Sequence, residues 1–147
     1  MKLLIVEDDL NKLKNLTLFL DMYGEEKDIK LDCTIKNSYQ SGLECILSEA
    51  FDLLLLDMSL PNFDTDDENP LAKGGELILY EMDVMGITLK TVIFTQHDDF
   101  EGESLESIHK DYKDKFSSFY IGYVFYNAIE SNWKRELEII LDGVMHD

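Results

Sequence analysis

Short continuous apolar runs alternate along the chain with longer stretches whose apolar residues follow helical spacing. The clearest run is Leu53–Leu56, four leucines that end directly at Asp57. Such a run between polar residues is typical of a strand buried on both faces, as in a parallel sheet. Ligands of open α/β sheets bind beyond the carboxyl ends of the strands, so Asp57 lies where such folds do their chemistry. Taken alone, Asp57 could equally cap the strand or the following turn.

The same patterns predict the other elements. Further strands are expected at 2–6, 30–36, 89–95 and 119–126, and helices at 9–23, 38–50, 76–84 and 129–144, with a weaker helical pattern over 100–116. Gly24 is expected to end the first helix and Ser38 to cap the second, in which Leu43, Ile46 and Leu47 should face the core. This alternation indicates a parallel sheet with helices on both faces and right-handed crossovers.

Length and charge narrow the possible functions. A chain of 147 residues suits one domain with one sizeable core. A formal charge of −18 argues against binding nucleic acid or an anionic membrane surface, and it favours cations and basic partner surfaces. No apolar run reaches the length of a secretory signal or a membrane span, so we expect a cytoplasmic protein. Cys33 and Cys45 have no metal-ligand spacing and are expected to be reduced core residues.

Acidic residues follow two of the predicted strands. The first strand ends at Glu7 and Asp8, and the third ends at Asp57. If the strands are neighbours, their carboxylates converge and repel one another unless a cation intervenes, and Mg²⁺ is commonly held by one or two carboxylates, waters and a phosphoryl oxygen. The fourth strand ends at Thr95, whose hydroxyl could bond a phosphoryl oxygen. Together these residues suggest phosphoryl transfer onto an aspartate, although any one acid alone is better explained as a loop cap in a very acidic protein.

These residues resemble those of the receiver domains of two-component response regulators. The resemblance is carried by Leu3–Asp9, by Asp52–Pro61 and by Val92–Thr95, and it spans the whole chain. It implies a flavodoxin-like (βα)5 doubly wound parallel sheet with strand order 2-1-3-4-5. It also implies that residues 1–147 form a single receiver domain with no output domain. Such a domain is no enzyme in the usual sense, since it takes part only in its own phosphoryl transfer and dephosphorylation.

The resemblance also implies roles for individual residues. Asp57 corresponds to the phosphoacceptor, and Asp8, Asp57 and the backbone carbonyl of Ser59 correspond to the Mg²⁺ site, with Glu7 acting through water. Thr95 corresponds to the switch hydroxyl and Tyr123 to the switch aromatic.

The chain departs from the usual receiver pattern at the end of the fifth strand. Receiver domains carry a lysine there that gives the phosphoryl group a positive charge, and here Tyr126 takes its place. A tyrosine offers one neutral hydrogen bond, which is weaker than a charge-assisted one. Lys73, in the loop 62–75, could instead swing toward Asp57, although loop lysines are ordinarily solvated.

Two loops at the same end of the sheet are longer than usual. They cover 62–75 and 96–118, and the second contains His97, which is more simply read as a solvated loop residue than as part of the site. The chain resembles a subgroup of stand-alone receivers with Thr-Gln-x-Asp and Tyr-Asn-x5-Trp patterns, matched here from Thr95 to Asp98 and from Tyr126 to Trp133.

Three functions are compatible with these residues. The first is a phosphorylatable receiver whose partners are a sensor histidine kinase or phosphotransfer protein and a downstream protein target. The second is a pseudo-receiver, a protein-interaction module that does not use phosphate, which the Tyr126 substitution favours. The third, an aspartyl-phosphate hydrolase, is disfavoured because Ser59 stands where that chemistry needs a second aspartate. The chain is expected to be a monomer or a weak homodimer that contacts neither nucleic acid nor membrane.

Overall fold

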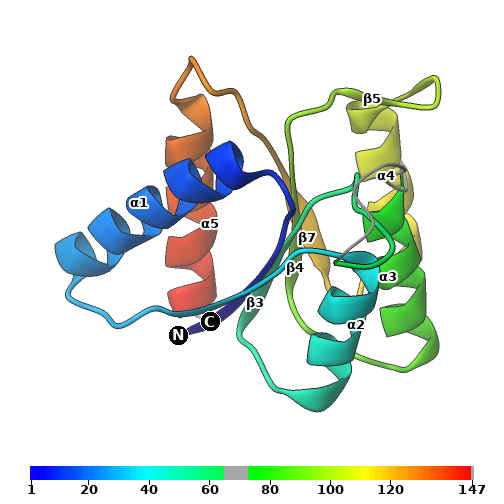
Figure 1. Cartoon of the computed structure of the whole chain (residues 1–147), viewed down its shortest axis with the longest axis horizontal. Coiled ribbons are helices and arrows are strands. Elements are labelled where there is room, and N and C mark those ends of the chain that lie inside the picture. Colours follow the sequence, from blue (N-terminus) through cyan, green and yellow to red (C-terminus); the bar gives the residue numbers. More distant parts are fainter. Residues whose placement is uncertain (65–72, 147) are drawn as a thin grey trace.

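The computed structural model describes residues 1–64 and 73–146, and these form a five-stranded parallel sheet flanked by helices (Figure 1). The strands are β1 (Lys2–Val6), β2 (Asp32–Lys36), β3 (Leu53–Leu56), β4 (Thr91–Thr95) and β7 (Tyr120–Phe125). Their order across the sheet is β2-β1-β3-β4-β7. This confirms the predicted flavodoxin-like order, in which the first and third strands are neighbours.

The helices form two layers on either side of the sheet (Figure 1). Helices α1 (Leu10–Lys27) and α5 (Asn132–Met145) cover one face, and α2 (Tyr39–Ser48), α3 (Gly74–Val84) and α4 (Leu105–Lys115) cover the other. The four leucines of β3 are buried and alternate between the two hydrophobic clusters under these layers. Burial on both faces explains why β3 is a continuous apolar run rather than an alternating one. None of the described helices combines the length and hydrophobicity that a membrane span requires.

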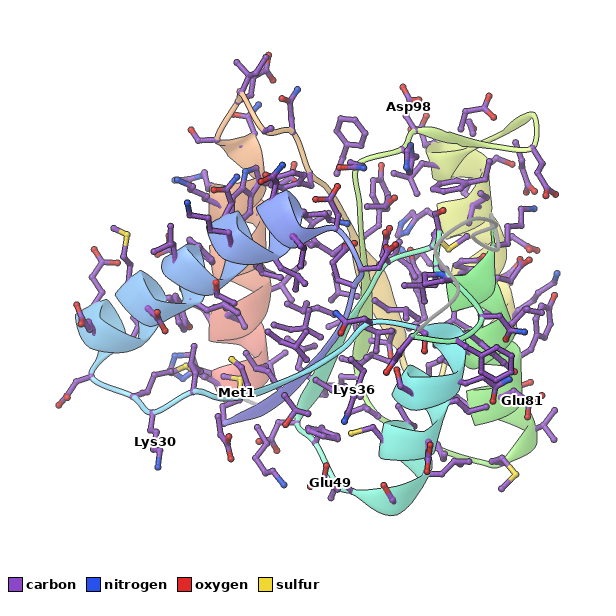
Figure 2. The ribbon with its side chains drawn as sticks, in the orientation of Figure 1. Met1, Lys30, Lys36, Glu49, Glu81 and Asp98 are labelled. Atoms are coloured by element: carbon purple, nitrogen blue, oxygen red, sulfur yellow. The ribbon has the colours of Figure 1, made fainter. Side chains whose placement is uncertain are left out.

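The parallel strands place all of their carboxyl ends at one end of the molecule (Figure 2). Lys30 and Glu49 precede β2 and β3, Asp98 follows β4, and the first two lie at the opposite end from Asp98. The residues that follow the strands therefore share one edge of the sheet, which is where the acids of the sequence motif fall.

Several predicted details were wrong. Helix α1 continues through Gly24 to Lys27 and ends where Asp28 adopts a left-handed backbone conformation, with φ of 53°. The chain then folds back so closely that a Cβ on residue 24 would lie 3.1 Å from the Ile29 carbonyl oxygen, which accounts for a glycine inside the helix.

The predicted burial of two residues was also wrong. Leu47 is exposed, with Cys45 buried in its place, and Cys33 is exposed on the edge strand β2.

The long segment after Thr95 contains an unpredicted hairpin before its helix. Strands β5 (Asp99–Phe100) and β6 (Glu103–Ser104) pair antiparallel across a turn at Glu101 and Gly102, both with positive φ. Phe100 is buried in the core, so the hairpin is packed against the domain. A two-strand hairpin is too short to give a periodic signal in the sequence. At the end of the chain, helix α5 begins at Asn132, three residues later than predicted.

Candidate functional site

Three carboxylates meet at the carboxyl ends of β1 and β3. Val6 and Leu56 are paired in the parallel register, and the Asp57 N–H donates to the Val6 carbonyl at 3.0 Å. The next residues of each strand therefore emerge side by side. One carboxylate oxygen from each of Glu7, Asp8 and Asp57 lies within 4.8 Å of the others.

Backbone amides hold two of these carboxylates in place. Glu7 Oε2 accepts from the N–H groups of Asp8 and Asp9, each at 3.1 Å, and Asp57 Oδ1 accepts from the Met58 N–H at 2.8 Å. Glu7 and Asp57 are buried, whereas Asp8 is exposed at the mouth of the cluster. Both oxygens of Glu7 are engaged inside the protein, the second by Lys12, so Asp8 and Asp57 are the freer ligands.

The buried side chain of Lys12 brings a positive charge from helix α1 into the cluster. Its Nζ forms an ion pair with Glu7 Oε1, lies 3.5 Å from Asp57 Oδ1, and donates to the Phe94 carbonyl of β4 at 2.6 Å. It also lies 5.0 Å from the centre of the Phe94 ring. Only 1% of the Lys12 side chain is exposed, so all of these interactions operate away from solvent. A buried ammonium group is tolerated only when it is paired and hydrogen-bonded, as it is here.

The local sequence sets the position of Lys12. Asp9 caps helix α1, and its Oδ1 accepts from the N–H groups of Asn11 and Lys12 at 3.0 and 3.1 Å. Lys12, Leu16 and Leu20 then follow one another at four-residue steps, so all three lie on the buried side of the helix. The cap and the helical spacing together direct the lysine toward the sheet.

Burial and mutual repulsion raise the pKa values of two acids. The pKa of Glu7 is raised to about 8, mainly by burial and next by the charge of Asp57, with Lys12 acting in the opposite direction. Burial also raises the pKa of Asp8, with Asp57 as the next cause. A cluster of carboxylates that resist ionising together favours a bound cation.

The cluster fits a hard divalent cation. Oxygen ligands from Asp8 and Asp57, with Glu7 behind them, match the carboxylate set with which proteins hold Mg²⁺. Ser59 lies two positions after Asp57 in the same loop and is partly exposed. Its backbone carbonyl remains a predicted ligand of the cation. Thr95 ends the neighbouring strand β4; it is buried, and its Oγ1 accepts from the His97 N–H at 3.2 Å.

No protein-family model matches the chain, but searches for similar sequences and structures agree with one another. The chain is 28% identical to the Detocs response regulatory protein DtcB of Enterobacter cloacae, a match that covers 93% of this chain and 95% of the relative. A CheY-like receiver domain from Methanospirillum hungatei superposes with a TM-score of 0.65 at 22% identity, covering 99% of this chain and 94% of the other. The chain has the fold of a response-regulator receiver domain.

A further solved receiver domain was described with a metal ion. The receiver domain of the sensor histidine kinase PA1611 from Pseudomonas aeruginosa has a magnesium ion coordinated in its active-site cleft. It superposes on this chain with a TM-score of 0.61 at 15% identity, covering 99% of this chain and 98% of the other. At that level of identity the comparison establishes the shared fold.

The two residues considered in place of the strand-end lysine have other partners for their polar groups. Tyr126 is buried among Phe94 and Trp133, and its hydroxyl accepts from the Asn15 side chain at 2.7 Å. Lys73 pairs with Glu103 of the β5–β6 hairpin at 3.0 Å. Neither group contacts the carboxylate cluster in these interactions.

Tyr123 and His97 have different neighbours. Tyr123 is partly buried beside α4, with its ring edge against His109 at a centroid distance of 4.9 Å. His97 is exposed, with its ring against Phe100. Residues 65–72 of the predicted loop 62–75 fall outside the described residues.

Sequence reasoning missed two residues at the site. The sequence did contain a sign of Lys12. It lies at four-residue steps from Leu16 and Leu20, on the apolar face of the predicted helix, where a charged residue either reaches into the core or interrupts the apolar face. Gly75, at the start of α3, carried only the general signal of a glycine in a loop. Its N–H donates at 2.9 Å to the carbonyl of Met58, the residue that follows Asp57.

Proposed function

We propose that this receiver domain accepts a phosphoryl group on Asp57 in a Mg²⁺-dependent reaction within a two-component phosphorelay. The observation that supports the proposal most is the approach of Glu7, Asp8 and Asp57 to within 4.8 Å at the carboxyl ends of two neighbouring strands. Repelling acids at a buried site cost stability, so their presence is best explained by a cation and a reaction.

The reaction is a transfer between two phosphoryl carriers. An Asp57 oxygen forms a bond to phosphorus, and the bond from phosphorus to the donor breaks, which leaves an acyl phosphate on the protein and the donor free. The donor is a phosphohistidine of a sensor histidine kinase or phosphotransfer protein, and later attack by water returns Asp57 and phosphate. Mg²⁺ on Asp8, Asp57 and the Ser59 carbonyl would offset the negative charge that gathers in this step.

The switch would pass from the site to the α4–β7 surface. Thr95 would bond the phosphoryl group as the switch hydroxyl, and Tyr123, two positions before the end of β7, would change its packing as the switch aromatic. His109 of α4 contacts the Tyr123 ring, so a movement of Tyr123 would alter the α4 surface. A downstream protein that binds this surface in one state only would read the switch.

Incubation with acetyl phosphate and Mg²⁺, followed by intact mass measurement, tests the proposal. Wild type and the control Asp83→Ala, which removes an exposed acid of α3, should gain one phosphoryl mass. Asp57→Ala should gain none, and omission of Mg²⁺ should abolish the gain in wild type. An unchanged wild-type mass, or an equal gain in Asp57→Ala, would contradict the proposal.

Besides the tyrosine at position 126, the pseudo-receiver is favoured by the contacts of Lys12, which already neutralises part of the acid cluster. A domain whose acids are satisfied internally can present the same fold as a phosphate-independent binding module. Partner binding distinguishes the two functions once a partner is in hand. Binding that is equal for wild type and Asp57→Asn, with and without acetyl phosphate, supports the pseudo-receiver.

A further inference from the structure

We propose that Lys12, carried by the first helix, is the phosphoryl-binding cation of this receiver domain and replaces the lysine missing after the last strand. The inference rests on the proposed function, and it assigns to that site a residue on an element that does not normally supply it. It also explains how a receiver with tyrosine at position 126 could still stabilise a phosphorylated Asp57.

Lys12 Nζ has two close partners and one more distant one. It donates to the Phe94 carbonyl at 2.6 Å and forms an ion pair with Glu7 Oε1. Asp57 Oδ1 lies 3.5 Å from Nζ, and an ammonium group has three donors, so donor capacity remains for Asp57. That separation is longer than the roughly 2.7–2.9 Å of a charge-assisted hydrogen bond, so this donor capacity is not fully used by the carboxylate.

A phosphoryl group on Asp57 would bring acceptor oxygens toward this donor. It carries three strong acceptor oxygens and additional negative charge, which extend beyond the Asp57 oxygen that bears it. Lys12 Nζ is already buried and fixed by two partners, so little side-chain entropy is lost when the third contact forms. In this buried setting a fixed positive charge interacts more strongly than it would in water.

The alternatives for this role are occupied elsewhere. The Tyr126 hydroxyl is engaged by Asn15, and the Lys73 ammonium by Glu103. Lys12 is therefore the cation that the described contacts place against Asp57. Its bond to the Phe94 carbonyl, one residue before Thr95, also ties the cation to the strand that carries the predicted switch hydroxyl.

Removing the Lys12 charge should change the binding of a phosphoryl analogue and the binding of Mg²⁺ alone in opposite directions, which gives a test with distinct signs. Lys12→Met removes the charge but keeps a long unbranched side chain. It should weaken binding of the phosphoryl analogue beryllofluoride, because a charged contact is lost, and strengthen binding of Mg²⁺ alone, because a competing cation is gone. A purely structural role of Lys12 would weaken both.

Binding is followed by the fluorescence of Trp133, the one tryptophan of the chain, whose ring packs against Phe94. Wild type and the matched control Lys14→Met, which changes an exposed lysine on the same helix, should bind beryllofluoride equally in the presence of Mg²⁺. Lys12→Met should bind it about tenfold more weakly and should be phosphorylated by acetyl phosphate about tenfold more slowly. Lys12→Arg, which keeps the charge, should recover part of both.

A second measurement needs no substitution in the site. In wild type labelled with ¹⁵N at lysine Nζ, the solvent-protected Lys12 ammonium signal should shift when beryllofluoride is added with Mg²⁺, and shift less with Mg²⁺ and fluoride alone. An unmoved signal, or Lys12→Met binding beryllofluoride within about twofold of wild type, overturns the assignment of Lys12. If wild type itself neither binds beryllofluoride nor gains phosphoryl mass, the proposed function fails and the assignment fails with it.

Discussion

Gly75 lies where helix α3 begins against the loop that carries Asp57. An added Cβ at this position would overlap the Asp57 carbonyl oxygen and would lie 3.0 Å from the Met58 Cα, both of which are backbone atoms that cannot rotate away. Its N–H also bonds the Met58 carbonyl. The residue is therefore small because the backbone of the candidate phosphoacceptor needs the space.

We expect Gly75→Ala to destabilise the domain by about 1–3 kcal/mol, the range for forcing extra atoms into packed structure. Gly143→Ala is the matched control, because its Cβ would meet nothing within 4 Å on helix α5. That change should raise the free energy of unfolding by up to about 1 kcal/mol through helix propensity. Urea denaturation of both variants measures the difference. Equal changes in the free energy of unfolding would show that the close backbone contact at Gly75 does not exclude a larger side chain.

Single residues also show how far the sequence could predict the site. Glu7, Asp8 and Asp57 were predicted to meet because each follows a buried apolar run, and neighbouring parallel strands bring such residues to one edge. Tyr126 was expected near the acids because the usual lysine stands at its position. Its ring packs with Phe94 and Trp133 under helices α1 and α5, and its role at the site stays a prediction.

At the scale of elements, helix α4 is packed on β7 through His109. Its Nδ1 lies 2.7 Å from the Tyr120 hydroxyl, and its ring contacts Tyr123, both from β7. Burial lowers the pKa of His109 below its ordinary value of 6.5, the Lys113 charge on the same helix lowers it further, and Glu106 opposes both. The neutral imidazole is thus the form that fits between the helix and the strand.

This shift makes the α4–β7 contact sensitive to acid. Because the pKa of His109 is lower in the folded state, the unfolded chain binds its proton first as the pH falls below about 6.5. Folding stability is then lost until the folded-state pKa is also passed, and no loss from this group occurs at higher pH. We expect wild type to lose more stability than His109→Gln between about pH 7.5 and about pH 5, as measured by urea denaturation. This range brackets the ordinary histidine pKa of 6.5. Parallel pH profiles for the two proteins would contradict the expectation.

The elements also show where periodicity fails as a guide. A helical pattern over 100–116 was right for α4, but it hid the β5–β6 hairpin, whose four paired residues are too few to show alternation. Gly24 was read as a helix end because glycine commonly ends helices. The tertiary contact with Ile29 gives that glycine another purpose, and Asp28 ends the helix instead.

At the scale of the whole molecule, the formal charge of −18 sets a repulsion that folding must overcome. Surface ion pairs act in the opposite direction, for example Lys27 with Glu138 and Asp142 on helices α1 and α5, at 3.7 Å each. Exposed pairs of this kind are each worth little. The net repulsion should therefore dominate the response to salt.

We expect stability to rise with ionic strength. Raising the salt from about 10 mM to about 1 M shortens the Debye length from roughly 30 Å to roughly 3 Å, which screens the repulsion. The melting temperature should rise by about 3 °C, corresponding to about 1 kcal/mol for a domain of this size. Choline chloride should give the same rise as sodium chloride, which separates screening from cation binding at the acids. A fall with either salt would mean that the ion pairs outweigh the net charge.

The sequence by itself determined the sheet and the acids that end its strands. Buried strands must be continuously apolar and must reach solvent at their ends, and both features are local and can be read along the chain. Only the tertiary structure decided which cation reaches those acids. Lys12 and Asp57 are far apart in the sequence, and their meeting depends on how helix α1 packs across β1 and β4. The groups that a helical side chain meets depend on how the helix packs in the core, and the local sequence pattern does not specify that packing.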